Sequence, residues 1–213
     1  MFHNGCLAGA SLLDGMASPA TSARRRGRPA AASREEVLAA VSRRYLRGER
    51  IDVQAIAGEL GLGRATIYRW FGSREGLIGA VLVDAAEPLL DDAARRARGR
   101  GGARLLDVFD RFNRGLARAP ALRKLVEQER AAALRIITSG AGAVQPRIVA
   151  MITRLIEEEV EAGRYEAPVE PSTLGYAIVR LAEAFLFNDA VAGIRGDVDR
   201  LRDVEAALLG VRR

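Results

Sequence analysis

LGLGRATIYRWFGSREGL, residues 60–77, places basic, hydroxyl and aromatic side chains between two glycines. Gly61 and Gly72 are of the type that commonly ends a helix, so the stretch between them predicts a short helix over about residues 64–71. A helix of this length is not stable alone in water. Its apolar side must therefore pack on neighbouring elements, which the flanking sequence has to supply.

The flanking sequence predicts three further helices. Ser33 begins the first, with Glu36 three residues later as its capping-box partner, and Gly48 ends it. Asp52 caps a short second helix that leads into the glycine turn. Ser73 caps a fourth, longer helix on the other side. The short helix over 64–71 is thus the third of four.

Two short helices that are joined by a glycine turn and packed on a preceding helix form a helix-turn-helix. At about 100° per residue, Ile67 and Phe71 share one side of the third helix, while Ala65 and Arg69 point nearly opposite. The first side predicts a buried anchor. The second presents a ridge of the size that enters the major groove of DNA, where side chains near the helix start reach the bases.

We therefore predict that the third helix reads DNA. Arg69 is the candidate for a bidentate contact with guanine, and Arg64 is a candidate for a base or a phosphate. Thr66 and Tyr68 suit phosphate contacts, and the methyl group of Thr66 or Ala65 suits a thymine methyl.

Ser73 and Arg74 open the fourth helix, whose free N–H groups also favour a phosphate. The sequence leaves open whether Trp70 contacts DNA or packs in the core. Residues 24–32 form a predicted basic arm that contacts phosphates or enters a minor groove. The arginines of this arm are Arg24, Arg25, Arg26 and Arg28.

The distribution of charge favours a polyanionic partner for the same region. Residues 21–76 carry 12 arginines against 6 acidic residues, whereas residues 77–213 carry 21 basic and 20 acidic ones. The net charge of +6 therefore lies almost wholly near the N-terminus. A generic solvated basic face is the alternative interpretation of this surplus.

The remaining chain predicts helices throughout. We place them near 103–118, 120–138, 144–162, 172–193 and 197–209, with no alternating strand pattern between them. The predicted fold is all-α, with a three-helix helix-turn-helix DNA-binding domain at the N-terminus and a helical ligand-binding and dimerisation domain at the C-terminus. The predicted divisions are a disordered tail (1–23), the basic arm (24–32), the DNA-binding domain (33–80) and the second domain (81–213).

Residues 33–80 resemble the N-terminal domain of the TetR family of bacterial repressors. The matching positions are Ile56-Ala57, Leu60-Gly61, Ala65-Thr66-Ile67-Tyr68, Phe71, Ser73-Arg74-Glu75 and Leu77. Gly63 departs from the pattern, because many members have a serine cap there, and so does Trp70, where His or Tyr is common. The resemblance implies an all-helical homodimer whose second domain binds an effector that controls DNA affinity.

Longer stretches extend the resemblance to the QsdR-type branch of that family. They are residues 52–81, 105–140 and 144–160. Regulators of this branch are associated with operons that degrade lactone quorum-sensing signals. The resemblance therefore implies a lactone effector, which an apolar pocket with a few polar groups would bind.

The second domain offers candidates for this pocket and for dimerisation. The helix over 172–193 is apolar nearly all round, so other helices must cover it on several sides. One possibility is a dimer in which a partner subunit packs on the last two helices. The alternative is a monomeric bundle in which this helix is central. The apolar candidates for the pocket are Phe109, Phe112, Leu116, Leu134, Ile137, Ile152, Leu155 and Phe185. The polar candidates are Asn113, Glu129, Arg130, Tyr176, Arg180 and Glu183.

Other functional classes find little support. Cys6 and His3 are the only cysteine and histidine, so histidine catalysis and a Cys/His metal site in the folded body are not expected. No residues are predicted as catalytic or metal-binding, and no cofactor is expected. The stretch Gly140-Ala141-Gly142 resembles the start of a nucleotide-binding loop, but Gln145 follows at the position where that motif needs a glycine. A nonspecific or architectural nucleic-acid-binding protein and a helical interaction module remain alternatives to a sequence-specific regulator.

The start of the chain lacks the features of a signal peptide, because it has no basic n-region and Asp14 interrupts the apolar run. Met16 is an alternative start that the sequence leaves open. No segment is apolar enough to span a membrane, and we expect a cytoplasmic protein.

Overall fold

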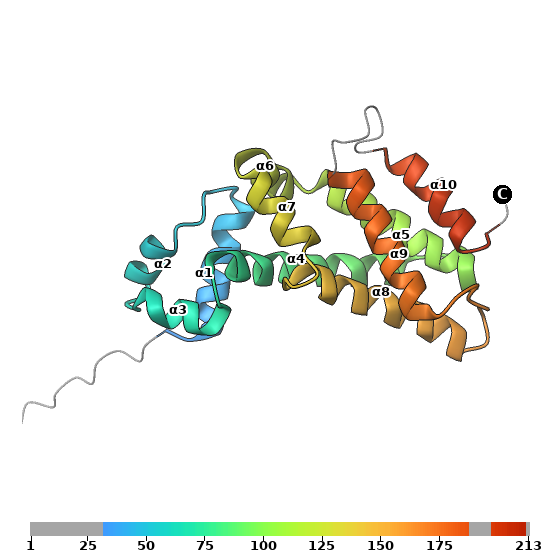
Figure 1. The fold of residues 1–213 in the computed structure, drawn as a ribbon, viewed down its shortest axis with the longest axis horizontal. Coiled ribbons are helices and arrows are strands. Elements are labelled where there is room, and N and C mark those ends of the chain that lie inside the picture. Colours follow the sequence, from blue (N-terminus) through green and yellow to red (C-terminus); the bar gives the residue numbers. More distant parts are fainter. Residues whose placement is uncertain (1–31, 188–196, 212–213) are drawn as a thin grey trace, which may run out of the picture. The chain divides into compact units, whose positions relative to one another are not determined.

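The computed structural model describes residues 32–187 and 197–211, and these form helices joined by short connections, without a strand (Figure 1). The bounds of the helices are α1 Arg34–Leu46, α2 Val53–Glu59, α3 Arg64–Phe71, α4 Arg74–Arg96, α5 Gly101–Arg118, α6 Pro120–Gln128, α7 Arg130–Thr138, α8 Val144–Glu161, α9 Pro171–Phe187 and α10 Val198–Leu208. The predicted tail, the basic arm up to residue 31 and the predicted end of the helix over 172–193 lie outside the described residues.

The predicted helix starts at the N-terminal end have the expected caps. The amide of Glu36 donates to Ser33 Oγ over 3.2 Å, and the amide of Ser33 donates back to the Glu36 carboxylate over 2.6 Å. Asp52 accepts from the first amides of α2, and Ser73 Oγ accepts from the Gly76 amide. Each cap uses amides that the first turn leaves without a helical partner.

The turn between α2 and α3 is closed by a glycine in the left-handed region. Gly61 has φ +64°, and the Leu62 amide donates to the Ala57 carbonyl over 2.8 Å. This is the Schellman arrangement, which satisfies the last carbonyls of a helix and reverses the chain. It aims α3 away from α2 at a defined angle, as the helix-turn-helix requires.

One prediction for the second domain was wrong in detail. The expected helix over 120–138 is two helices, α6 and α7, because Glu129 leaves the helical conformation with φ −137° and ψ 48°. The carboxylate of Glu129 is held by Arg74 at the start of α4, a partner 55 positions away in the chain. A contact over this separation leaves no mark on the local sequence pattern.

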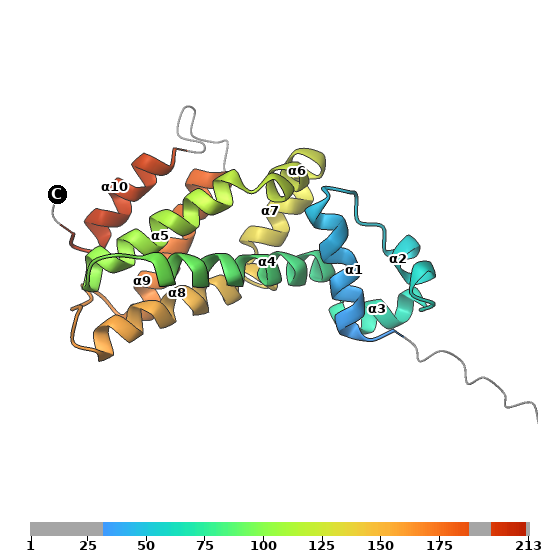
Figure 2. The same ribbon diagram turned by 180° about the vertical axis from the view of Figure 1, so that it is seen from behind.

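Two clusters of buried side chains make up the core. The first joins α1, α2 and α3 to the first half of α4 and to α6 and α7. The second joins the later part of α4 to α5, α8, α9 and α10. Leu116 and Ile148 pack against both clusters. The predicted boundary at residue 80 falls inside α4, which runs from the helix-turn-helix to the second domain (Figure 2).

Among the described helices, none is long and apolar enough to cross a membrane.

Candidate DNA-reading helix and effector cavity

The third helix presents the predicted reading face to solvent. Ile67 is fully buried and holds α3 onto the core, and Phe71 packs partly buried beside it. The Arg34 guanidinium lies 4.6 Å from the centre of the Phe71 ring and covers it by a cation–π contact. On the opposite side Arg69 is exposed. Arg64, Ala65 and Tyr68 are exposed as well, and Thr66 is partly exposed.

Trp70 and Ser73 flank this face. Trp70 is partly buried and packs against the first core cluster, which is the packing alternative that the sequence left open. Ser73 is exposed, and its hydroxyl accepts from the Gly76 amide as the cap of α4. The remaining N–H groups at this helix start lie beside α3, where a DNA phosphate would approach.

Arg74 differs from its predicted role as a phosphate contact. Its guanidinium makes a bidentate pair with Glu129, with N–O distances of 2.7 and 2.6 Å, and its Nε donates to the Ile51 carbonyl over 3.0 Å. Arg50 approaches the same carboxylate within 3.5 Å. Hydrogen bonding to Arg74 lowers the pKa of Glu129. The pair thus ties the start of α4 to the junction of α6 and α7.

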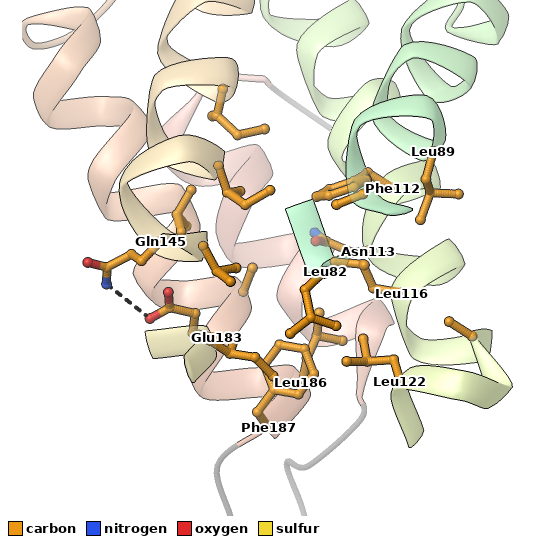
Figure 3. Close-up of a pocket in the computed structure, with 18 of the residues that line it drawn as sticks. Leu82, Leu89, Phe112, Asn113, Leu116, Leu122, Gln145, Glu183, Leu186 and Phe187 are labelled. Atoms are coloured by element: carbon orange, nitrogen blue, oxygen red, sulfur yellow. Dashed lines mark hydrogen bonds between the residues drawn. The ribbon is translucent and has the colours of Figure 1, made fainter. Parts of the chain in front are cut away.

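A cavity of about 120 Å³ lies where the two core clusters meet. Its walls come mainly from α4, α5, α8 and α9. Single side chains are contributed by four other helices: Tyr45 of α1, Leu122 of α6, Ile137 of α7 and Glu205 of α10. Figure 3 shows most of its lining residues, among them the apolar side chains Leu82, Leu89 and Phe112. The cavity is therefore lined both by α4 and by α1, the first helix of the DNA-binding domain.

Few polar groups line this cavity. Asn113 Nδ2 donates to Glu205 Oε1 over 3.0 Å, and both side chains are buried. On the other wall Gln145 Nε2 lies 3.5 Å from Glu183 Oε2 (Figure 3), and Arg180 pairs with that carboxylate over 2.7 Å. Burial raises the pKa of Glu183 despite Arg180, and burial raises the pKa of Glu205 to about 8. Both carboxyls therefore favour the neutral form more than usual.

Six of the predicted effector residues line the cavity. They are Phe109, Phe112, Asn113, Leu116, Ile152 and Glu183, and the further apolar candidate Ile137 joins them. Glu205, Gln145 and Tyr45 also line the cavity but are not among the residues predicted from the sequence. The signal for Glu205 was present, since it lies among the apolar positions of the last helix, but only the fold brings it to Asn113.

The other predicted effector residues lie elsewhere. Glu129 holds Arg74, and Arg130 begins α7. Tyr176 is 51% exposed on the outside of α9. Leu134 and Arg180 line an adjacent hollow of about 250 Å³, which shares Glu183 and Phe187 with the cavity. The further candidates Leu155 and Phe185 are absent from the cavity wall too. Helical periodicity identified apolar positions but not which of the several buried sides faces the cavity.

Comparison with known proteins shows the family of this chain. The family described as tetracyclin repressor-like, C-terminal domain, matches residues 100–210. The transcriptional repressor QsdR of R. erythropolis, from the TetR family, is 30% identical, with a TM-score of 0.79; the match covers 84% of this chain and 95% of that one. The chain belongs to the TetR family.

A second solved structure shows the same fold. The TetR family repressor AlkX of Dietzia sp. strain DQ12-45-1b is 24% identical, with a TM-score of 0.58, and the match covers 84% of this chain and 96% of that one. No curated protein sequence matched. TetR-family membership confirms the all-α fold with an N-terminal helix-turn-helix and a helical second domain, and it supports a DNA-binding transcriptional regulator.

In this TetR-family regulator, we predict that Arg74 and Glu129 act as one structural unit. Separate Arg74→Ala and Glu129→Ala substitutions should each destabilise the fold, and the double variant should lose about 1–3 kcal/mol less than their sum, because each single change removes the same pair. Chemical denaturation of the four proteins measures this coupling.

Measuring operator affinity at several salt concentrations distinguishes this structural role of Arg74 from a contact with a DNA phosphate. Loss of a phosphate contact would reduce the salt slope of affinity by about 1. We expect Arg74→Ala to leave that slope unchanged. If the two stability losses are additive and Arg74→Ala reduces the salt slope of affinity, Arg74 contacts a DNA phosphate as first predicted.

Proposed function

We propose that this protein is a sequence-specific repressor that binds a palindromic operator as a homodimer and leaves it when a small apolar effector enters the cavity. The observation that carries this proposal is the exposed face of α3, where Arg69 stands out from a helix anchored by Ile67. An arginine in this position has the length and the paired donors to read a guanine.

The proposal assigns the remaining contacts as the sequence suggested. Arg64 contacts a base or a phosphate, Thr66 and Tyr68 contact phosphates, and Ser73 marks the helix start that receives one. The arginines of the arm, Arg24 to Arg28, follow the adjacent backbone or minor groove.

Dimerisation is proposed through α9 and α10. These two helices pack together, and each carries an exposed apolar side chain, Tyr176 on α9 and Val204 on α10. Two-fold packing of these helices against a second copy would cover both side chains. The dimer then holds two copies of α3 about 34 Å apart, one turn of DNA, so each reads one half-site.

The effector acts through α4. Leu82, Ala85 and Leu89 of α4 line the cavity, and the first turn of the same helix follows α3 directly. A ligand that prefers one position of α4 changes the separation of the two reading helices. A coupling of about 1–3 kcal/mol would lower operator affinity about five- to 150-fold. The resemblance to QsdR-type regulators implies a lactone as this effector.

The test is competition binding with palindromic and random DNA of equal length at fixed salt. We expect palindromic DNA selected by the protein to bind with two chains per site and at least about 10³-fold more tightly than random DNA, and an effector to lower only the specific affinity. Equal affinity for both DNAs would identify a nonspecific nucleic-acid-binding protein. An unchanged operator affinity across the effector titration would refute the switch.

A further inference from the structure

Glu205 is the most deeply buried acidic side chain in the wall of the effector cavity. It lies on α10 with 0% exposure, and Asn113 of α5, which is 2% exposed, donates to its Oε1 atom over 3.0 Å. Its second oxygen, Oε2, is buried and has no hydrogen-bond partner among the described residues. A buried polar atom without a partner costs about 1–3 kcal/mol. Because Glu205 belongs to the cavity lining, a ligand that bonded to Oε2 would remove this cost.

The charged groups around Glu205 are engaged with one another. Asp110 accepts from Arg114 Nε over 2.9 Å, and Arg114 also reaches Asp199. Arg202, from the same helix as Glu205, lies 4.0 Å from Asp110. No arginine nitrogen forms an ion pair with Glu205 in the described part of the chain. Among the described residues the carboxyl is thus left without an ion-pair partner.

This environment selects the protonated form of the carboxyl. Burial raises the pKa of Glu205 to about 8, further aided by the negative charge of Asp110 and opposed by the Asn113 hydrogen bond and by Arg202. At neutral pH the group therefore carries a proton. Because Oε1 already accepts from Asn113, the proton belongs on Oε2, which makes Oε2 a hydrogen-bond donor.

We propose that Glu205, positioned by Asn113, is the polar anchor of the cavity and donates from Oε2 to the carbonyl oxygen of a neutral, otherwise apolar ligand, such as an ester, lactone, amide or ketone. This inference rests on the proposed function, in which the cavity holds the effector. It also defines what the cavity rejects. A carboxylate ligand would meet the carboxyls of Glu205 and Glu183 in the same cavity lining and would lose its hydration there.

The anchor joins elements that the proposed switch requires. Glu205 belongs to α10 and Asn113 to α5, and most of the apolar lining of the cavity comes from α4, α5, α8 and α9. A ligand held at Glu205 therefore has its apolar part against Leu82 and Leu89 of α4. The polar end of the ligand is thus recognised by Glu205, while its apolar end contacts α4 and shifts that helix.

The experiment measures ligand binding by calorimetry on the full chain, without DNA. The probes are γ-octalactone, its ring-opened hydroxy acid, octylamine and butylbenzene. We expect the wild type to bind γ-octalactone about tenfold more tightly than butylbenzene, because one buried hydrogen bond separates the two. The hydroxy acid and octylamine should bind at least about tenfold more weakly than the lactone.

Two variants separate hydrogen bonding from shape. Glu205→Gln keeps both an acceptor for Asn113 and a donor for the ligand, so lactone binding should change less than about threefold. Glu205→Leu keeps the bulk and removes the donor, so the lactone should lose its tenfold advantage over butylbenzene. Thermal unfolding of both variants checks their folding; if Glu205→Leu does not fold, Glu205→Gln and the infrared measurement below decide the matter.

Infrared spectroscopy observes the anchor directly. The difference spectrum between the wild type and Glu205→Gln at pH 7 should contain the C=O stretch of a protonated carboxylic acid, and γ-octalactone should shift it to lower frequency. The proposal would be overturned if this band were absent or if its frequency did not change when lactone binds. It would also be overturned by failure of the wild type to bind γ-octalactone, by lactone binding by Glu205→Leu equal to that of the wild type, or by tighter binding of octylamine or the hydroxy acid.

These outcomes are distinct from those that test the proposed function. If γ-octalactone releases operator DNA from Glu205→Leu and from the wild type at the same concentration, the effector cavity stands and the anchor falls. If γ-octalactone binds in calorimetry as expected but operator affinity does not change, the anchor stands and the switch falls.

Discussion

Arg69→Ala is expected to abolish most of the difference between operator and random DNA while leaving the dimer intact. Arg69 is exposed on α3, and the loss of a bidentate guanine contact costs about 1–3 kcal/mol per half-site. A dimer loses it twice, so operator affinity should fall roughly 30-fold or more. The fold should be unaffected, because the core beneath α3 is made by Ile67 on the opposite side.

Two controls make this result specific to base reading. Arg69→Lys keeps the charge but not the paired donors, so it should retain nonspecific binding and lose specificity. Arg154→Ala removes another exposed arginine, from α8, and should leave both affinities unchanged. If Arg69→Ala weakens operator and random DNA by the same factor, the residue contacts a phosphate and the reading role passes to Arg64.

Glu159→Gln is expected to cause the largest loss of stability. Glu159 is 1% exposed, and its carboxylate accepts from Arg164 Nε and NH2 over 2.9 Å each, from Arg104 over 3.1 Å and from the Gly101 amide over 2.9 Å. These bonds tie the end of α8 to the start of α5. Removing the charge leaves two arginines and a buried amide with weakened partners, which should cost about 3 kcal/mol.

The pH dependence of this loss has a definite sign. Hydrogen bonding to Arg164 lowers the pKa of Glu159 in the folded protein, so the unfolded chain takes up its proton first as the pH falls. The stability from Glu159 is then complete above the unfolded carboxyl pKa of about 4.3, and it is lost as the pH falls through the folded pKa. The free energies of unfolding of wild type and Glu159→Gln should therefore converge below about pH 4.

The neighbouring residue supplies the matched control. Glu158 is on the same helix, its side chain is 48% exposed, and it pairs with Arg154 at i,i+4 spacing. Glu158→Gln should change the free energy of unfolding by less than about 0.5 kcal/mol. If denaturant titrations give equal losses of stability for both substitutions, the buried position of Glu159 adds no stability beyond that of an exposed ion pair.

Local signals account for the parts of the fold that the sequence predicted well. Caps such as Ser33 and Asp52 act within three residues, and the left-handed Gly61 acts within one turn. The exposure of Arg69 opposite Ile67 follows from helical spacing alone. These features depend on neighbours along the chain, so an isolated sequence was enough to predict the helix-turn-helix and its outward face.

Contacts between distant residues decided the rest. Glu129 breaks a predicted helix because it meets Arg74, and Glu205 enters the cavity because α10 packs on α5 beside Asn113. In each case the two partners are 55 or 92 positions apart, and no spacing rule relates them. The sequence by itself thus determined which segments are helical and which face of α3 meets solvent. Only tertiary packing decided which buried sides enclose the cavity and which carboxyl is buried there without an ion-pair partner, because burial is a property of the surrounding elements.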